Sequence, residues 1–237
     1  MVRNIPNSIT CCNLISGCIA TMYAFGCDQK MALLFIVIGA TFDFFDGMSA
    51  RLLGVSSPIG KELDSLADVI TFGMAPATMV FTLLSGLNYP ATLAPLRPIL
   101  PYTAFLIAAF SALRLAKFNL DERQAMGFIG LPTPANALFW SSAIVGIGAI
   151  LAHHEWAPIA VLPMILLSCF LLIAELPMFA LKFKHTGWRG NEVKFIFILT
   201  CVPLLVFLGL PGFAAVIAWY VVLSMIVWIG KNNKERK

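Results

Sequence analysis

Eight long hydrophobic stretches divide this 237-residue chain, and they constrain its fold more than any other feature. About 20 apolar residues are enough to cross a bilayer as an α-helix, and somewhat shorter spans are tolerated. We therefore predict an all-α fold, a polytopic transmembrane helical bundle of about eight spans. The spans are expected near residues 6–26, 30–53, 62–87, 98–118, 133–151, 157–179, 193–208 and 211–229.

The composition agrees with a chain that is embedded in a membrane. Charged residues make up 12% of the sequence, whereas soluble domains contain about 25%. No linker, low-complexity segment or charge run bounds a second domain, so residues 1–237 are predicted to form one membrane-embedded domain. The first span has no small-residue cleavage site and is expected to remain as a transmembrane helix. The last two spans, within residues 193–229, share a very short connection and form a tight hairpin, for which a re-entrant arrangement stays open.

The placement of lysine and arginine predicts the orientation of the spans. With both termini cytoplasmic, the outer connections contain only Lys30 and Arg97 of the 16 basic residues. The net charge of +4 then reflects topology and contact with anionic lipid headgroups, and it does not suggest nucleic acid as a partner. We expect an integral protein of the cell (inner) membrane. The predicted cytoplasmic basic residues are Arg3, Arg51, Lys61, Arg114, Lys117, Arg123, Lys182, Lys184, Arg189, Lys194, Lys231, Lys234, Arg236 and Lys237.

Two pairs of aspartates interrupt the second and third hydrophobic stretches. Asp43 and Asp46 are three residues apart, and Asp64 and Asp68 are four apart, so on helices each pair shares one face. One aspartate near the middle of a membrane costs about 2.5–3.5 kcal/mol on insertion scales. Four of them within 26 residues therefore require compensating cations or a wet cavity. Carboxylate oxygens gathered in this way suit hard divalent metals such as Mg²⁺ or Mn²⁺.

Small residues and one arginine lie between the two acidic pairs. Gly47, Ala50 and Gly60 leave room for a bulky polar substrate to approach the backbone, and Arg51 supplies a fork of donors that fits phosphate. The second span is predicted to run inward and the third outward, with a short loop between them. Both acidic pairs then lie just inside the cytoplasmic interface, a depth that suits a reaction between a lipid headgroup and a water-soluble substrate.

The spacing D-x2-D-G-x2-A-R-x8-G-x3-D-x3-D over residues 43–68 resembles the signature of the CDP-alcohol phosphatidyltransferase family. All eight positions match, and they are Asp43, Asp46, Gly47, Ala50, Arg51, Gly60, Asp64 and Asp68. The resemblance implies direct transfer of a phosphatidyl group from CDP-diacylglycerol to an alcohol, assisted by two divalent ions. It also implies a homodimer.

The resemblance also implies roles for individual residues. Its metal ligands would be the four aspartates, and Asp68 would also act as the general base. The residues implied to bind CDP-diacylglycerol within the motif are Asp43, Gly47, Ala50, Arg51 and Gly60.

A polar stripe runs along the first hydrophobic stretch. Asn7, Thr10, Asn13, Gly17 and Thr21 recur every three or four residues and share one helical face. From Asn13 to Thr21, helix–helix hydrogen bonding with small-residue packing is the favoured interpretation. Asn7 and Thr10 lie at the predicted depth of the carboxylates. The family resemblance, through a P-N-x-x-T element, implies that these two residues lie beside the nucleotide.

Three further segments resemble the phosphatidylserine synthase branch of the family. They are S-L-A-D-x-x-x-F-G-x-A-P-A at 65–77, R-L-A-K-F-N at 114–119 and F-I-G-L-P-T-P-A-N at 128–136. Lys117 stands where that branch typically has arginine, and Asn136 where it has alanine. The resemblance implies L-serine as the acceptor alcohol, with phosphatidylserine and CMP as products. A family member that uses glycerol 3-phosphate or inositol phosphate is the alternative.

Serine carries a carboxylate and an ammonium group, so its binding site needs a fixed cation and acceptors. We expect Arg114, Lys117 and Asn119 to bind serine, because they lie at the cytoplasmic end of the fourth stretch. Gly130 and Pro132 would shape the adjacent wall. Two plainer interpretations stay open: the basic residues could merely mark a cytoplasmic helix end, and the segment around Pro132 could be a turn that opens the fifth span.

Two other classes of protein also tolerate acids within the membrane. A cation transporter would explain the aspartates alone, but not the glycines and the arginine at fixed spacing. A non-catalytic lipid-binding or scaffold protein would not need the complete set of four acids. A covalent phosphohistidine route is excluded, because none of the three histidines is followed by lysine two residues later.

Overall fold

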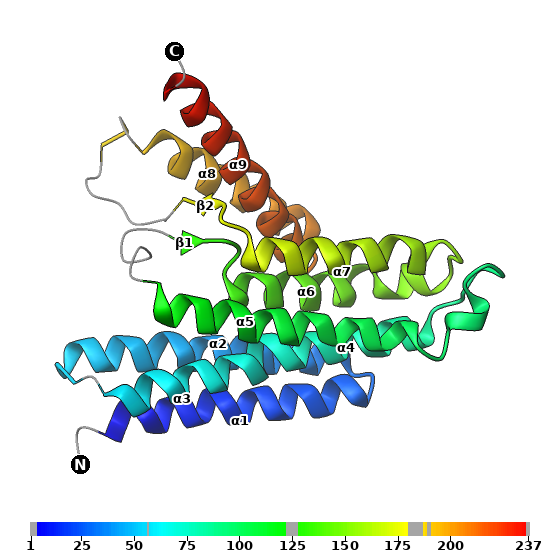
Figure 1. Ribbon diagram of the computed structural model, residues 1–237, viewed down its shortest axis with the longest axis horizontal. Coiled ribbons are helices and arrows are strands. Elements are labelled where there is room, and N and C mark those ends of the chain that lie inside the picture. Colours follow the sequence, from blue (N-terminus) through cyan, green and yellow to red (C-terminus); the bar gives the residue numbers. More distant parts are fainter. Residues whose placement is uncertain (1–3, 56, 122–127, 180–186, 189–190, 236–237) are drawn as a thin grey trace.

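The computed structural model describes residues 4–55, 57–121, 128–179, 187–188 and 191–235, and helices dominate them (Figure 1). A π-helix, η2 (Val69–Met74), joins α3 to α4, and two 3₁₀ segments, η3 (Ala94–Leu96) and η4 (Leu100–Phe105), precede α5. The α-helices are α1 (Ile5–Phe25), α2 (Gln29–Leu52), α3 (Pro58–Asp68), α4 (Ala75–Gly86), α5 (Leu106–Leu120), α6 (Thr133–Ala152), α7 (Ala157–Ile173), α8 (Glu192–Leu208) and α9 (Gly212–Glu235).

Six helical runs are long and apolar enough to cross a membrane. They are α1, α2, the continuous run 58–86, the run 100–120, α6, and residues 212–230 of α9. The prediction of a helical membrane protein is confirmed in this form. Helices α7 and α8 have 17 residues each and are about 25 Å long, short of a hydrocarbon core of about 30 Å. The count of eight spans therefore stays a prediction.

The sixth predicted stretch, 157–179, is not one helix throughout, and in this respect the prediction was wrong. Helix α7 ends at Ile173, and the chain then forms the strand β2 (Pro177–Met178). This strand pairs antiparallel with β1 (Phe128–Ile129). Proline disfavours helical backbone at the residue before it, which keeps the segment ahead of Pro177 extended and available for pairing.

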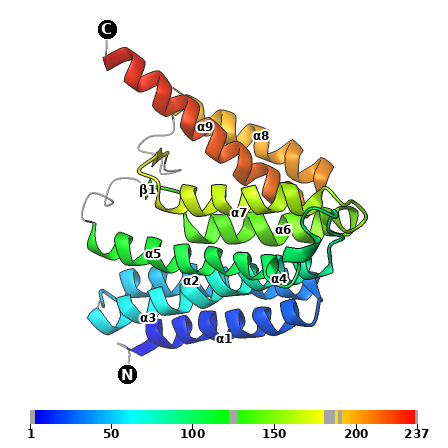
Figure 2. The ribbon, with the colours of Figure 1, turned by 45° about the vertical axis from the view of Figure 1, so that its right-hand side comes forward.

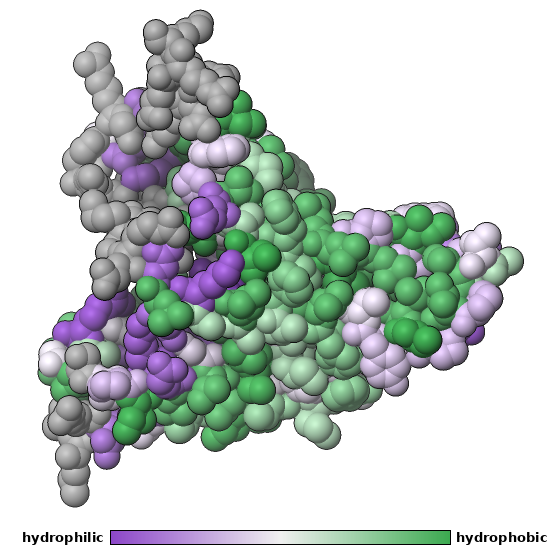
Figure 3. Space-filling model, viewed as in Figure 1, coloured by the Kyte–Doolittle hydropathy of each residue, from purple (hydrophilic) through white to green (hydrophobic). Residues whose placement is uncertain are grey.

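Helices α1 to α7 pack side by side with their axes roughly aligned, and the α8–α9 hairpin lies obliquely against them in both views (Figures 1 and 2). The main core gathers buried apolar side chains from α1, α2, η2, α4, α5, α6 and α7, including Ile36, Phe72, Met79 and Ile165. Because the apolar residues of these helices face both the core and the lipid, hydrophobic side chains also cover the middle of the outer surface (Figure 3).

Hydrophilic side chains gather toward the two ends of the aligned helices (Figure 3). The start of α1, the α2–α3 connection and the end of α9 lie toward the same end, which agrees with an even number of crossings (Figure 1). Which end faces the cytoplasm stays a prediction. Seven of the basic residues used to orient the chain lie outside the described residues, namely Arg3, Arg123, Lys182, Lys184, Arg189, Arg236 and Lys237.

Candidate active site

Helices α2 and α3 are joined by a short turn that brings both acidic pairs to one end of the bundle. Gly54 has a φ of +61°, in the left-handed region that glycine adopts without strain. Ser57 then caps α3, because its side chain accepts a hydrogen bond of 3.0 Å from the backbone N–H of Gly60. Pro58 occupies the first turn of α3, where its missing N–H has no cost. Both α2 and α3 contact α1. A space remains between the start of α1, the end of α2 and the start of α3.

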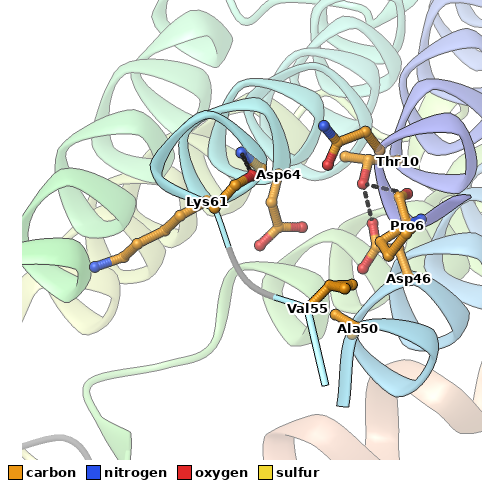
Figure 4. A pocket seen from close by; sticks show the side chains of 11 residues that line it. Pro6, Thr10, Asp46, Ala50, Val55, Lys61 and Asp64 are labelled. Atoms are coloured by element: carbon orange, nitrogen blue, oxygen red, sulfur yellow. Dashed lines mark hydrogen bonds between the residues drawn. The ribbon is translucent and has the colours of Figure 1, made fainter. Parts of the chain in front are cut away.

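This space is a cavity of about 270 Å³, called the first cavity below (Figure 4). It brings together seven residues that the sequence assigned to metal or CDP-diacylglycerol: Asn7, Thr10, Asp46, Gly47, Ala50, Gly60 and Asp64. The carboxylates of Asp46 and Asp64 enter it from different helices. The rest of its lining is Pro6, Val55, Ser57 and Lys61.

Two glycines leave this cavity open. A Cβ atom on Gly47 would meet nothing within 4 Å. A Cβ atom on Gly60 would lie 3.0 Å from Asn7 Oδ1 and 3.0 Å from Ser57 Oγ, which is tighter than ordinary contact. A side chain at Gly60 would therefore press on Asn7, one of the residues expected to contact the nucleotide.

Thr10 fixes the orientation of Asp46 at the wall of the first cavity. Its Oγ1 donates a 2.6 Å hydrogen bond to Asp46 Oδ2, and it also lies 3.0 Å from the backbone oxygen of Pro6 (Figure 4). Asp46 is buried, so this bond replaces water that the carboxylate would otherwise bind. The sequence placed Thr10 beside the nucleotide; the structure shows that it also acts on Asp46.

Three of the four aspartates form a tight cluster. Asp43, Asp64 and Asp68 each offer a carboxylate oxygen, and these oxygens lie within 4.8 Å of one another. Asp64 Oδ1 is buried and has no hydrogen-bond partner in the described part of the chain. Like charges so close together, with an unpartnered buried oxygen among them, fit the ligand set of a hard divalent cation. Asp46 lies close enough for its charge to interact with those of the other three.

Asp64 belongs to both the carboxylate cluster and the lining of the first cavity. A cation held by the cluster would therefore face a group bound in the cavity. Asp43 and Asp68 complete the cluster from outside that lining.

The motif suggests that Arg51 faces the first cavity, but its side chain lies outside the lining of that cavity. Its side chain is exposed, and Nε donates a 2.9 Å hydrogen bond to the backbone oxygen of Gly47 on its own helix. It is not among the residues that line the first cavity in the described structure. This hydrogen bond uses Nε alone and leaves the donors on the two Nη atoms of Arg51 out of the contact with Gly47.

Lys61 is a cavity residue that the sequence analysis counted only as a positive charge. Its stem lines the first cavity, while Nζ points away and donates a 2.9 Å hydrogen bond to the backbone oxygen of Asn119 (Figure 4). Asn119 in turn donates from Nδ2 to Ser65 Oγ at 2.8 Å, so α3 and the end of α5 are tied together. The sequence contained an indication that Lys61 lies at the cavity, because Lys61 directly follows the motif glycine Gly60.

A second cavity of about 380 Å³ lies between the ends of α5 and α7. Arg114 and Lys117 line it together with Asp121 and Glu175. Its apolar lining residues are Leu120, Ile129, Leu172, Ile173 and Ala174. Two of the five predicted serine-binding residues therefore line one space.

Arg114 is the link between this second cavity and the carboxylate cluster. It is buried, and its Nη1 donates a 3.1 Å hydrogen bond to Thr133 Oγ1. Its guanidinium lies over the ring of Phe118 at 5.4 Å from the centroid, and its charge interacts with that of Asp68. Its Nε atom is buried and has no hydrogen-bond partner in the described structure.

The other predicted serine-binding residues have different surroundings. Asn119 turns toward α3 through its bond to Ser65. Gly130 has a φ of +75°, and a Cβ there would lie 2.8 Å from the backbone oxygen of Leu172, so only glycine lets this loop pack on the end of α7. Pro132 immediately precedes α6 and opens it, as the turn interpretation predicted.

The family model of the CDP-alcohol phosphatidyltransferases matches residues 3–180 of this chain. The chain belongs to this family. Its match covers the carboxylate cluster and the first cavity, and it ends before α8, so the α8–α9 hairpin lies outside it. The family resemblance inferred from the motif is thereby confirmed. The cation-transporter and scaffold interpretations are left without support.

Several curated proteins that resemble this chain share one name. A protein of Bacillus subtilis, named CDP-diacylglycerol–serine O-phosphatidyltransferase, is 41% identical over 55% of this chain and 69% of its own length. Proteins of the same name from Mycobacterium leprae and Methanocaldococcus jannaschii are 32% and 29% identical. The match to the Mycobacterium leprae protein covers 62% of this chain and 47% of the relative, and the match to the Methanocaldococcus jannaschii protein covers 96% of each. The chain is therefore a membrane-embedded transferase.

Proposed function

We propose that this enzyme transfers the phosphatidyl group of CDP-diacylglycerol to L-serine and forms phosphatidylserine and CMP. One observation carries the proposal: the cluster of Asp43, Asp64 and Asp68 shares Asp64 with a cavity lined by small and polar residues. The names of the relatives support serine as the acceptor.

The first cavity is the proposed site of the CDP group. Its small residues, Gly47, Ala50 and Gly60, let the substrate approach the backbone, and Asn7 and Thr10 offer polar contacts. Lys61 lines the same cavity, and its ammonium reaches the phosphates if it leaves the oxygen of Asn119. The diacylglycerol chains extend into the surrounding lipid.

The four aspartates are the proposed ligands of two divalent ions, Mg²⁺ or Mn²⁺. The fit rests on the unpartnered oxygen of Asp64 and on the closeness of the carboxylates of Asp43, Asp64 and Asp68. Such ions, when bound, neutralise a pyrophosphate and stabilise the attacking and leaving oxygens. Activity is expected to disappear on treatment with EDTA and to return with Mg²⁺ or Mn²⁺. Activity that survives chelation would contradict this part of the proposal.

Asp68 is the proposed general base. It takes the proton of the serine hydroxyl while that oxygen forms a bond to the phosphorus of the phosphatidyl group, and the bond from phosphorus to the CMP oxygen breaks. The position of Asp68 supports this role, because it is buried in the carboxylate cluster and lies near Arg114, which lines the proposed serine site.

The second cavity is the proposed site of serine. Arg114 offers a buried guanidinium with an unpartnered Nε to the serine carboxylate, and Lys117 adds a second positive charge. Asp121 and Glu175, in the same lining, are acceptors of the type that an ammonium group needs. Because Arg114 also lies near Asp68, serine bound here would have its hydroxyl close to the proposed base.

The acceptor is tested by supplying CDP-diacylglycerol with one labelled alcohol at a time to the purified protein. L-serine, glycerol 3-phosphate and inositol phosphate form the panel. We expect labelled phosphatidylserine and stoichiometric CMP with serine only. A labelled lipid from another alcohol, with none from serine, would assign the enzyme to a different acceptor within the family.

We also propose that the protein spans the cell (inner) membrane eight times as a homodimer, with both termini and the active site on the cytoplasmic side. The start of α1 and the end of α9 lie toward the same end, which supports an even number of crossings, and the cytoplasmic assignment of that end rests on the placement of lysine and arginine. In a cysteine-free background, a cysteine at Ile59 should react with a membrane-impermeant reagent only from the cytoplasmic side, and one at His154 only from outside. The reverse pattern would contradict the topology, and chemical cross-linking in membranes tests the dimer.

A further inference from the structure

Asn13 lies in the middle of α1 and is fully buried. Its Nδ2 donates a 3.2 Å hydrogen bond to Asp68 Oδ1, across from one helix to another. The sequence pattern favoured helix packing for this residue, and the structure shows that its packing partner is the proposed general base. Asn13 itself lies outside the lining of the first cavity.

A second hydrogen bond anchors Asn13 to the segment that follows Asp68. Thr71, in η2, donates from Oγ1 to the backbone oxygen of Asn13 at 3.0 Å. The same residue of α1 thus holds the carboxylate of Asp68 through its side chain and Thr71 through its backbone. Asp68 and Thr71 are three residues apart, so the two bonds fix about one turn of the chain.

Two glycines allow α1 and α2 to approach Thr71 closely. A Cβ atom on Gly17 of α1 would lie 2.3 Å from Thr71 Oγ1. A Cβ atom on Gly39 of α2 would lie 2.5 Å from Thr71 Cγ2 and 3.0 Å from Asn13 Oδ1. No side chain fits at either position without moving Thr71 or the backbone. Thr71 and Asn13 are therefore held by tightly packed helices on two sides.

The turn that Asn13 anchors is itself unusual. The π-helix η2 begins directly after Asp68, and π-helical turns inside α-helices are rare and frequent at functional sites. A π-turn changes the direction in which the following side chains point relative to a regular α-helix. The bond from Thr71 to Asn13 ties this wider turn to α1 immediately beside the catalytic carboxylate.

We infer that Asn13 is a positioning residue that orients the Asp68 carboxylate toward Asp43 and Asp64, with Thr71, Gly17 and Gly39 holding Asn13 in place. The inference rests on the proposed function, because it assumes that the orientation of Asp68 matters for turnover. Partners that hydrogen-bond a carboxylate ligand typically change metal affinity or activity by 10- to 100-fold when they are removed. A packing role alone would require only the volume of Asn13, not its donor.

The decisive variant is Asn13→Leu, which keeps a similar volume and removes the donor. We expect kcat to fall roughly 10- to 100-fold while the KM for CDP-diacylglycerol changes little. A second readout does not depend on turnover: the rise in Tm that Mn²⁺ produces in the purified protein should be smaller than in the wild type. The matched control is Ser16→Ala, because Ser16 is also buried on α1 but bonds Cys12 of its own helix. It should behave as the wild type in both measurements.

Wild-type kcat together with a wild-type response to Mn²⁺ in the Asn13→Leu variant would overturn the inference. If that variant fails to elute as a folded protein, Thr71→Val decides the matter, since it keeps the shape of Thr71 and removes its bond to Asn13. We expect it to lower kcat in the same direction by a smaller factor, and an unchanged kcat would overturn the inference. All variants are assayed with the alcohol that the wild type uses. Failure of the wild type with serine therefore contradicts the proposed acceptor alone.

Discussion

The two cavities at this end of the bundle are built in different ways. The first is lined entirely by residues between 6 and 64, from α1, α2, α3 and the connection between α2 and α3. The second is lined by residues 114, 117, 120, 121, 129 and 172–175, which meet because α5 packs on α7 and because the pairing of β1 with β2 and the close approach of Gly130 bring Ile129 to the end of α7. Fixed spacing along adjacent helices describes the first cavity. No spacing in the sequence describes the second.

The difference matters for how the two substrates are recognised. The first cavity offers small residues and the carboxylates of Asp46 and Asp64, whereas the second offers the buried guanidinium of Arg114 with Lys117 beside it. If CDP-diacylglycerol occupies one and serine the other, substitutions in each should change the KM of one substrate only. Asp68, next to both, should affect turnover instead.

The largest effect is expected at the junction of the two sites. Asp68→Asn keeps the shape of the side chain and removes its basicity, so turnover should fall roughly 10²- to 10⁴-fold. Binding of CDP-diacylglycerol should persist, because Asp68 lies outside the lining of the first cavity. CMP release and nucleotide binding are measured on the same preparation. Near-wild-type CMP release would remove Asp68 from the role of general base.

Arg114→Ala tests the second cavity. Loss of a hydrogen bond to a charged group, about 1.5–3 kcal/mol, should raise the serine KM roughly 10- to 150-fold and leave the CDP-diacylglycerol KM nearly unchanged. Arg114→Lys should be intermediate, because it keeps the charge and loses the planar fork. Saturation curves for both substrates provide the measurement. A rise in both KM values together would mean that Arg114 supports the structure, through Thr133, and not serine alone.

Gly60→Ala tests the first cavity. The new Cβ would press on Asn7 Oδ1 and Ser57 Oγ, and disturbing the cap of α3 costs about 1 kcal/mol. Because a displaced Asn7 would lose a hydrogen bond to the nucleotide, about 0.5–1.5 kcal/mol, we expect the CDP-diacylglycerol KM to rise roughly 2- to 10-fold at an unchanged serine KM. Gly86→Ala is the matched control, since its Cβ would meet nothing within 4 Å at the other end of α4. A larger change in the serine KM would break the division between the two cavities.

Lys61→Met should give the smallest effect and sharpens the comparison. The substitution keeps a long stem on the cavity wall and removes the ammonium, whose exposed interactions contribute less than about 1 kcal/mol. We expect the CDP-diacylglycerol KM to rise roughly 2- to 5-fold. If the serine KM rises instead, Lys61 acts through Asn119 on the end of α5, and the two cavities are coupled by that contact.

Much of the first site was predictable because it depends on local helix geometry. The intervals between Asp43 and Asp46 and between Asp64 and Asp68 place each pair on one face, and a short turn with Gly54 brings the pairs together. The sequence did not reveal that Asp46 is held by Thr10 while the other three aspartates form the tight cluster. It also did not reveal that Arg51 folds back on Gly47, since a motif position does not fix a rotamer.

The sequence by itself predicted a helical membrane protein with four aspartates at helical intervals on two neighbouring hydrophobic stretches, and its motif predicted the family that the family model confirms. The membrane helices follow from hydropathy and the shared faces of the aspartate pairs from helical periodicity, which are local, whereas the family was predicted from the resemblance of the motif at residues 43–68. Only the tertiary structure decided which side chains hydrogen-bond to the aspartates and to Lys61. Asn13 and Asp68 are 55 residues apart, and Lys61 and Asn119 are 58 apart. Contacts of this kind depend on the docking of whole helices. At Asn13 this docking includes close approaches to Thr71 at Gly17 and Gly39, which no periodic pattern specifies.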